Sequence, residues 1–198
     1  MWVDSITPDD VRGRTRVGKL APTNLAEAIR TAMAIKHPWY RCQALTMAAE
    51  HSTSRNQQLA LLREAFDTAQ LQEEINRAVT VSAWPLRVLA PLEPREAEKN
   101  LVALVAQANH EPHSLRRADA LFALAGAVQS NETLLNLVVP SLTHALANGH
   151  GWRIDRIIRS TVELLKQRMP AVAHDLVALH SDNRKNKSSL HHLQSYEI

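Results

Sequence analysis

The chain has 198 residues, of which 45% are hydrophobic but only 4% aromatic, and its formal net charge is +3. Its 28 alanines and 26 leucines favour closely packed helices, and its five glycines argue against a sheet-rich fold. So small a basic excess is not typical of a dedicated nucleic-acid-binding domain. Cys42 is the single cysteine, which excludes an intramolecular disulfide.

Targeting and membrane signals are not evident in the sequence. The N-terminal segment carries acidic residues and no apolar core, so we expect no secretory signal. No apolar run approaches the ~18 residues that a membrane-spanning helix needs, so we expect no membrane association. A cytoplasmic location is the default expectation that follows.

Residues 1–22 form the first segment, which we expect to be a polar N-terminal extension. It contains a group of basic residues, namely Arg12, Arg14, Arg16 and Lys19. From residue 23 onward, apolar side chains recur at the three- and four-residue spacing of an amphipathic helix. Residues 23–180 are therefore the predicted helical domain, and residues 181–198 are a polar tail that we expect to be disordered.

Nine helices are predicted in the helical domain, most of them starting at a capping residue or a proline. They begin near Asn24, Pro38, Ser54, Gln72, Pro94, Pro112, Asn131, Trp152 and Pro170, and the last ends near His180. Pro85 and Pro140 fall inside the fourth and seventh helices, where we expect kinks. Because the connections are short, neighbouring helices are predicted to pack antiparallel.

An arginine recurs near the start of every second helix and marks an internal repeat. Arg41, Arg77 and Arg117 are separated by 36 and 40 residues, and Arg153 continues the series after another 36. Apolar residues follow each arginine at offsets that share one helix face. We interpret the four arginines as structural, with stems that cover apolar surface and guanidinium groups that hydrogen-bond the end of the preceding helix.

Two of these segments resemble HEAT-like repeats. The best matches are Tyr40-Arg41 with Ala44-Leu45 after Pro38, and Leu115-Arg116-Arg117 with Ala120-Leu121 after Pro112. The resemblance covers residues 23–180. It implies an all-α, right-handed superhelix of about four antiparallel helix pairs plus a ninth C-terminal helix, with a concave face for recognition. The junction Asp of better HEAT units is missing, which leaves TPR-like or irregular α-α packing open.

Three short motifs look catalytic at first but lack the parts that their chemistry needs. Gly13–Lys19 matches G-x-x-x-x-G-K, yet no strand precedes it and Leu20 stands where a Ser or Thr would bind magnesium. His110 and His113 flank Pro112, which breaks the helix that a zinc pair requires. Cys42 has no base and orienting group around it. We therefore predict no catalytic residue, no metal and no cofactor.

The helix that starts at Trp152 carries the best candidate binding residues. Trp152, Arg156, Arg159 and Lys166 lie at helical offsets that predict one exposed stripe, opposite Ile154, Ile157, Ile158 and Leu165. An exposed tryptophan beside arginines suits an acidic protein surface or a phosphate backbone. We assign these four residues as candidate binding residues. The alternative is a solvated face with no partner.

Three functions remain open from the sequence. The first is a non-enzymatic protein-binding scaffold, adaptor or inhibitor in a small bacterial-looking protein, including by analogy an immunity protein that neutralises a toxin. The second is nucleic-acid binding, including a HEAT-like glycosylase that excises alkylated bases. Trp152 and Asp155 are the residues that come closest to the aromatic residue and catalytic carboxylate of such an enzyme. The third is a subunit of a larger assembly, with the oligomeric state undetermined. The charge of the inner curve should discriminate between them.

Overall fold

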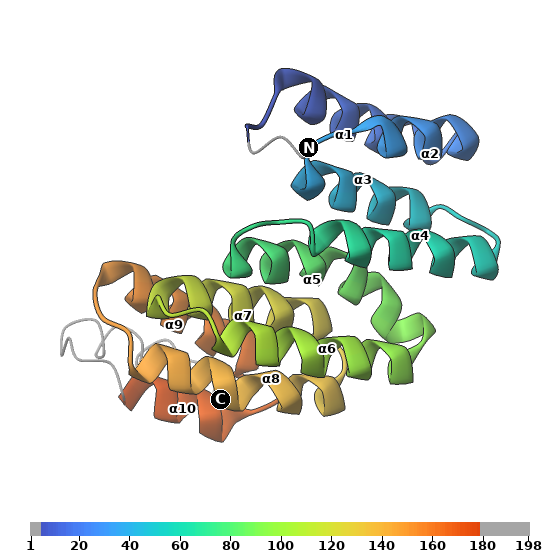
Figure 1. Cartoon of the computed structure of the whole chain (residues 1–198). Helices are drawn as coiled ribbons and strands as arrows, with labels where there is room; N and C mark the ends of the chain where they lie inside the picture. Colours follow the sequence, from blue (N-terminus) through green and yellow to red (C-terminus); the bar gives the residue numbers. More distant parts are fainter. Residues whose placement is uncertain (1–4, 179–198) are drawn as a thin grey trace.

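The computed structural model describes residues 5–178, which fold into ten α-helices without a strand (Figure 1). Helices make up 80% of the described residues. In chain order they are α1 (Pro8–Leu20), α2 (Leu25–Ala34), α3 (Pro38–Glu50), α4 (Arg55–Ala69), α5 (Ile75–Leu92), α6 (Pro94–Asn109), α7 (Ser114–Val128), α8 (Glu132–Ala147), α9 (Trp152–Leu165) and α10 (Pro170–Ala178). None of them is long and apolar enough to cross a membrane. The predicted polar tail, residues 181–198, lies outside the described residues.

The helices stack in two layers, as a superhelical array does. Each odd-numbered helix packs against the next odd-numbered one, from α1 through α9, whereas α6 and α8 are the main contact between even-numbered helices in the described part. A two-layered array curves toward its tighter layer, because neighbouring helices there are closer together. We call the five odd-numbered helices the inner layer and the five even-numbered helices the outer layer. The predicted all-α superhelical arrangement is thereby confirmed.

Helix starts follow the predicted capping residues closely. Asn24, Ser54 and Asn131 each accept a hydrogen bond from the backbone N–H three residues on, at 3.1, 3.4 and 3.1 Å. Pro38 and Pro94 occupy the first turns of α3 and α6, where the missing N–H costs nothing. The helix predicted from Pro112 starts two residues later, at Ser114, and α5 starts at Ile75 instead of Gln72.

Helix α1 was not predicted: Pro8–Leu20 are helical and lie within the segment expected to be an extension. The Thr7 hydroxyl accepts from the Asp10 backbone N–H, and the Asp10 carboxylate accepts from the Thr7 backbone N–H, which completes a capping box. Apolar side chains are few in this helix, and Val17 is the one that is buried. The apolar periodicity on which the prediction relied is therefore weak here, although the cap is present.

Asp10 anchors α1 to the junction between α2 and α3. This residue is only 4% exposed, and its Oδ1 accepts from the backbone N–H groups of Lys36 and His37 at 3.1 and 3.0 Å, where α2 meets α3. Burial alone would raise the pKa of this carboxyl. Hydrogen bonds from the Thr7 hydroxyl and from the backbones of His37, Thr7 and Lys36 outweigh it and lower the pKa to about 2.

Asp10→Asn is expected to destabilise the protein by about 2 kcal/mol near neutral pH. The lowered pKa means that the folded state stabilises the charged Asp10 carboxylate by that amount, and asparagine carries no such charge. The contribution is fully present above pH ~4 and is lost as the pH falls through ~2. Urea titrations of both proteins at several pH values measure it. Asp9→Asn is the control, because Asp9 is exposed and its ion pair among residues 5–178 is with the exposed Arg12. A variant whose free energy of unfolding equals that of the wild type at pH 7 would contradict the anchoring role.

Candidate functional site

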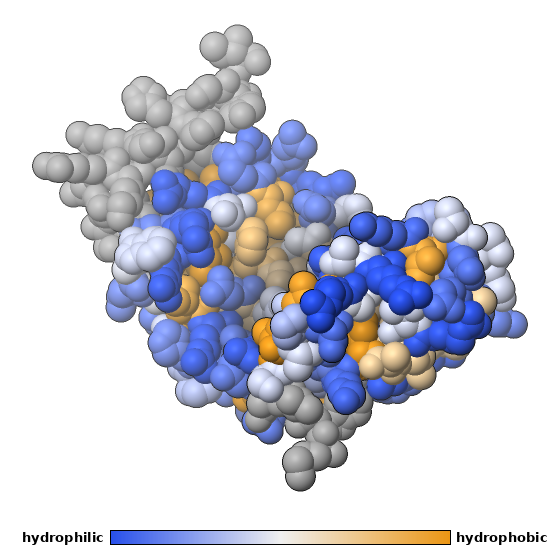
Figure 2. All heavy atoms as spheres, turned by 90° about the horizontal axis from the view of Figure 1, so that it is seen from above, coloured by the Kyte–Doolittle hydropathy of each residue, from blue (hydrophilic) through white to orange (hydrophobic). Residues whose placement is uncertain are grey.

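A groove of about 410 Å³ opens on the inner layer between α5 and α7. Its lining residues are Thr80, Ala83, Trp84 and Arg87 from α5, and Ala123, Gly126 and Ala127 from α7. We call this set the inner groove. On each helix these residues recur every three or four positions, so each helix contributes one face. Seen from the α1 end, hydrophobic side chains gather in a recess bordered by hydrophilic residues (Figure 2).

Small residues form the floor of the inner groove. A Cβ atom built on Gly126 would meet no atom within 4 Å, so no neighbour in the described chain requires a glycine at this position. Glycine in a helix costs up to ~1 kcal/mol relative to alanine. Its presence in α7 is therefore not explained by internal packing, and the space it leaves faces the inner groove.

Trp84 and Arg87 are the large side chains that line the inner groove. The guanidinium of Arg14, on α1, lies 5.6 Å from the ring centroid of Trp84, so the first helix reaches across to the third helix of the inner layer. Arg14 Nε is buried and has no hydrogen-bond partner among the described residues. Arg87 pairs with Glu50 of α3 at 2.6 Å. Large amphipathic side chains around a small apolar floor are typical of a protein-recognition surface.

A second cluster lies at the start of α9, and we call it the α9 cluster: Trp152, Arg153, Arg156 and Arg159. Trp152 is 62% exposed, and the guanidinium groups of Arg153 and Arg156 lie 5.3 and 5.7 Å from its ring centroid. In residues 5–178, none of the three arginines has an ion-pair partner within 4 Å. The cluster therefore presents net positive charge beside an exposed aromatic ring.

Asp119 of α7 connects the two features, and sequence reasoning did not single it out. Partial burial raises the pKa of its carboxyl, while the positive charges of Arg156 and Arg153 oppose that rise. Asp119, Ala123 and Gly126 share one face of α7 at offsets of four and three residues. Because α7 packs against α9 and Asp119 feels the charges of Arg153 and Arg156, the α9 cluster lies near this face of α7, about one helical turn before the inner groove.

Charge is distributed unequally between the layers. Inner-layer helices carry twelve Arg and Lys residues against six Asp and Glu. Outer-layer helices carry five against seven. The small net charge of the whole chain therefore conceals a basic inner layer and a slightly acidic outer layer.

The four candidate binding residues differ in their exposure. Trp152, Arg156 and Arg159 are exposed on α9, as the stripe predicts. The Lys166 side chain is only 16% exposed and pairs with Glu163 at 2.6 Å, so it lies outside the exposed stripe. Asp155, which was considered with Trp152 for the glycosylase, is 9% exposed. An exposed ring and a buried carboxylate do not form a pair on one accessible face.

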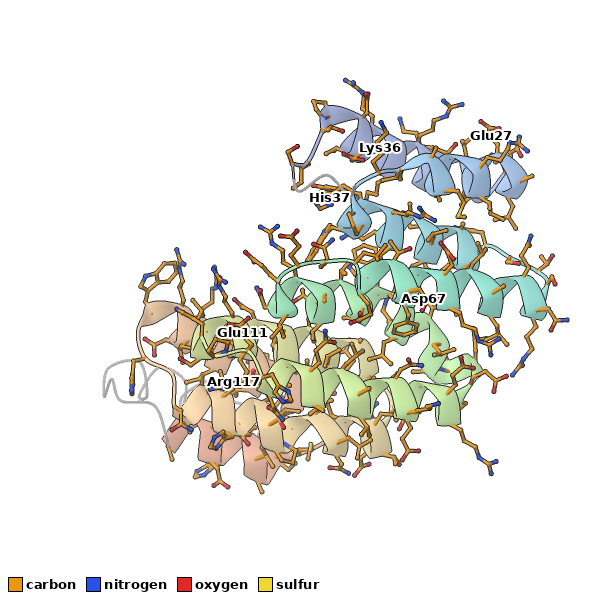
Figure 3. All side chains as sticks on the ribbon, in the orientation of Figure 1. Glu27, Lys36, His37, Asp67, Glu111 and Arg117 are labelled. Atoms are coloured by element: carbon orange, nitrogen blue, oxygen red, sulfur yellow. The ribbon has the colours of Figure 1, made fainter. Side chains whose placement is uncertain are left out.

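The four repeat arginines all lie on the inner layer, on α3, α5, α7 and α9, but their contacts differ. Arg117 donates to the Glu111 carbonyl at 3.2 Å, beside the end of α6, which is the contact predicted for the series (Figure 3). Arg41 pairs with Glu64 of α4 at 2.6 Å, and Arg77 pairs with Glu74 at 3.3 Å. Arg153 instead belongs to the α9 cluster.

The motifs that resembled catalytic sites occupy structural positions. Gly13 and Lys19 lie within α1, whose backbone N–H groups are engaged in the helix. His110 follows the last residue of α6 and His113 precedes the first residue of α7, in the turn between the two helices. Among residues 5–178, no three His, Cys, Asp or Glu side chains are grouped so that they could hold a metal ion.

Cys42 is fully buried in α3, and its Sγ donates to the Val81 carbonyl at 3.6 Å. Burial raises the pKa of the thiol well above its ordinary range, and the hydrogen bond with Thr46 opposes the rise only in part. Ellman's reagent is therefore expected to label the native protein no faster than it unfolds, and to label it at once in urea. Rapid labelling under native conditions would show instead that the thiol is accessible and reactive.

Gly126→Ala is expected to stabilise the protein by about 0.5–1 kcal/mol, since alanine favours the helix and its Cβ enters open space. Gly13→Ala is the matched control within α1. There a Cβ would lie 2.9 Å from Cγ1 of the buried Ile35, so this substitution is expected to be destabilising. Thermal unfolding of both variants measures the difference. Destabilisation by Gly126→Ala would show that the glycine serves internal packing.

No protein-family model, curated protein or solved structure matches this chain.

Proposed function

We propose that this protein is a non-enzymatic, HEAT-like binding scaffold, an adaptor or inhibitor that holds a segment of a partner protein in the inner groove. The observation that carries the proposal is the open groove over Gly126, a helical glycine with no neighbour in the described chain that requires it. A partner that packs against this floor would compensate for the lower helix propensity of glycine.

The chemistry around the inner groove supports a protein partner. Trp84 and Arg87 are residue types that dominate protein interfaces, and both border the groove. The floor is apolar and the surrounding side chains are charged, which is the arrangement of a desolvated interface core within a polar rim. Stacked helix pairs present such surfaces on a rigid framework, so little conformational entropy is lost on binding.

Nucleic-acid binding is the second candidate, and the basic inner layer favours it. Arginines without acidic partners, such as those of the α9 cluster, suit phosphate groups. Against it, Glu50 and Asp119 also lie on the inner layer, and an apolar floor of alanine and glycine offers a phosphate backbone no hydrogen-bond donor. The glycosylase version gains no support from Asp155, which is buried.

A photo-crosslinking experiment tests the proposal. With benzoylphenylalanine at Thr80, in the wall of the inner groove, we expect a covalent adduct with one discrete protein in the cells that make this chain. The same residue at Ala103, which is exposed on the outer layer, should give none. Gly126→Leu should abolish the Thr80 adduct, because its side chain fills the groove while keeping a good helix former in α7.

Two outcomes would contradict the proposal. Adducts that contain only nucleic acid, or protein adducts at Thr80 that persist undiminished in Gly126→Leu, would mean that the inner groove does not hold a protein segment. Circular dichroism of each variant first shows that the helical fold is intact.

A further inference from the structure

We propose that the partner segment is an acidic amphipathic helix, whose apolar face lies on the floor of the inner groove and whose carboxylates pair with the α9 cluster. This inference rests on the proposed function and adds the chemistry of the partner. Three observations carry it: the unpaired arginines of α9, the form of the groove floor, and the position of one relative to the other.

Among residues 5–178, the arginines of α9 have no acidic side chain within 4 Å, and Asp119 acts on Arg153 and Arg156 only at longer range. Arg77, Arg87 and Arg116 lie within 4.0 Å of a glutamate. The three arginines of the α9 cluster have no such neighbour in the described part of the chain. Complementary charge on a partner is the simplest way to neutralise them.

Local electrostatics disfavour this arrangement in the free protein. Arg153, Arg156 and Arg159 follow one another at three-residue spacing, where like charges on a helix repel by a few tenths of a kcal/mol per pair. Arg153 also lies in the first turn, where the helix dipole disfavours positive charge. Stacking on Trp152 and the charge of Asp119 offset these costs only for Arg153 and Arg156, and binding of carboxylates would relieve the remainder.

Stacking on Trp152 orders two of the guanidinium groups. Arg153 and Arg156 both lie within 6 Å of the ring centroid, so they lose less conformational freedom when they bind. A guanidinium presents parallel N–H donors that match the two oxygens of a carboxylate. Glutamate or aspartate side chains are therefore well matched to the cluster.

The groove floor favours a helix over an extended strand. Its walls are helices, in which most backbone N–H and C=O groups pair within the helix, so an extended peptide would find few backbone partners there. Pro85 and Pro91 of α5 free only the carbonyls of Val81, which accepts from Cys42, and of Arg87. A helical segment satisfies its own backbone. Ala83, Ala123 and Gly126 allow such a helix to approach closely.

The two surfaces are close enough for one short helix. Helix α7 packs against α9, and the charges of Arg153 and Arg156 act on Asp119. Gly126 lies seven residues further along α7, which corresponds to about 10 Å. A partner helix of two or three turns would therefore span both surfaces. Its acidic residues would gather toward the α9 end.

A panel of three labelled helical peptides of about five turns tests the inference. The peptides share one leucine-alanine face and differ in the polar face, which carries glutamate, glutamine or lysine. Fluorescence anisotropy with the full-length protein should give the glutamate peptide at least about tenfold higher affinity than the glutamine peptide, and no binding of the lysine peptide. Added salt should reduce the advantage of glutamate.

Two variants locate the effect. Arg153→Gln with Arg156→Gln should weaken the glutamate peptide about tenfold and leave the glutamine peptide unchanged. The control is the pair Arg95→Gln and Lys99→Gln, which removes the same charge from exposed positions on the outer layer. Gly126→Leu should abolish binding of the glutamate and glutamine peptides alike.

The results separate the inference from the proposed function. Equal binding of the glutamate and glutamine peptides, with loss in Gly126→Leu, would overturn the acidic partner and leave the protein-binding groove standing. Binding of a short DNA duplex with no binding of any peptide would overturn both. Equal weakening by the α9 and control pairs would also overturn the assignment to the α9 cluster.

Discussion

Packing of each odd-numbered helix against the next is the contact on which the remaining structure depends. Fully buried alanines such as Ala44 and Ala48 in α3, and Ala118 and Ala125 in α7, allow helix backbones to approach closely. The outer helices do not pack against one another to the same extent, so the array curves toward the inner layer. The inner groove forms on that layer, along the line where α5 and α7 meet.

Helix α1 adds to this curve an element that does not belong to the arginine repeat. Its capping aspartate is fastened to the α2–α3 junction, where Figure 3 labels Lys36 and His37. From the same helix, Arg14 reaches Trp84 on the wall of the inner groove. One buried carboxylate thereby anchors a helix whose Arg14 lies against Trp84 of the inner groove. The hydrogen bonds of Asp10 therefore affect both the stability of the fold and the shape of the inner groove.

The sequence predicts the parts of the fold that depend on local signals. Asn24, Ser54 and Asn131 begin helices where their side chains cap the first turn, and the arginine period identifies α3, α5, α7 and α9 as one layer. Helix α1 escapes prediction because its stability comes from contacts with Lys36 and His37, distant in sequence, and not from an apolar stripe. The inner groove is not predicted either, because Trp84 and Gly126 belong to different helices.

The sequence predicts only part of the candidate site, and the reason is physical. Periodicity places Trp152, Arg156 and Arg159 on one face of α9, but it does not reveal that Lys166 folds back onto Glu163 or that Arg153 joins the cluster. Natural sequences mostly agree with their local structure, so residues that oppose it indicate a second requirement. Gly126 opposes helix propensity, and three arginines oppose the electrostatics of α9. Both lie on the inner layer, on helices that pack against each other, and a single bound segment would account for both.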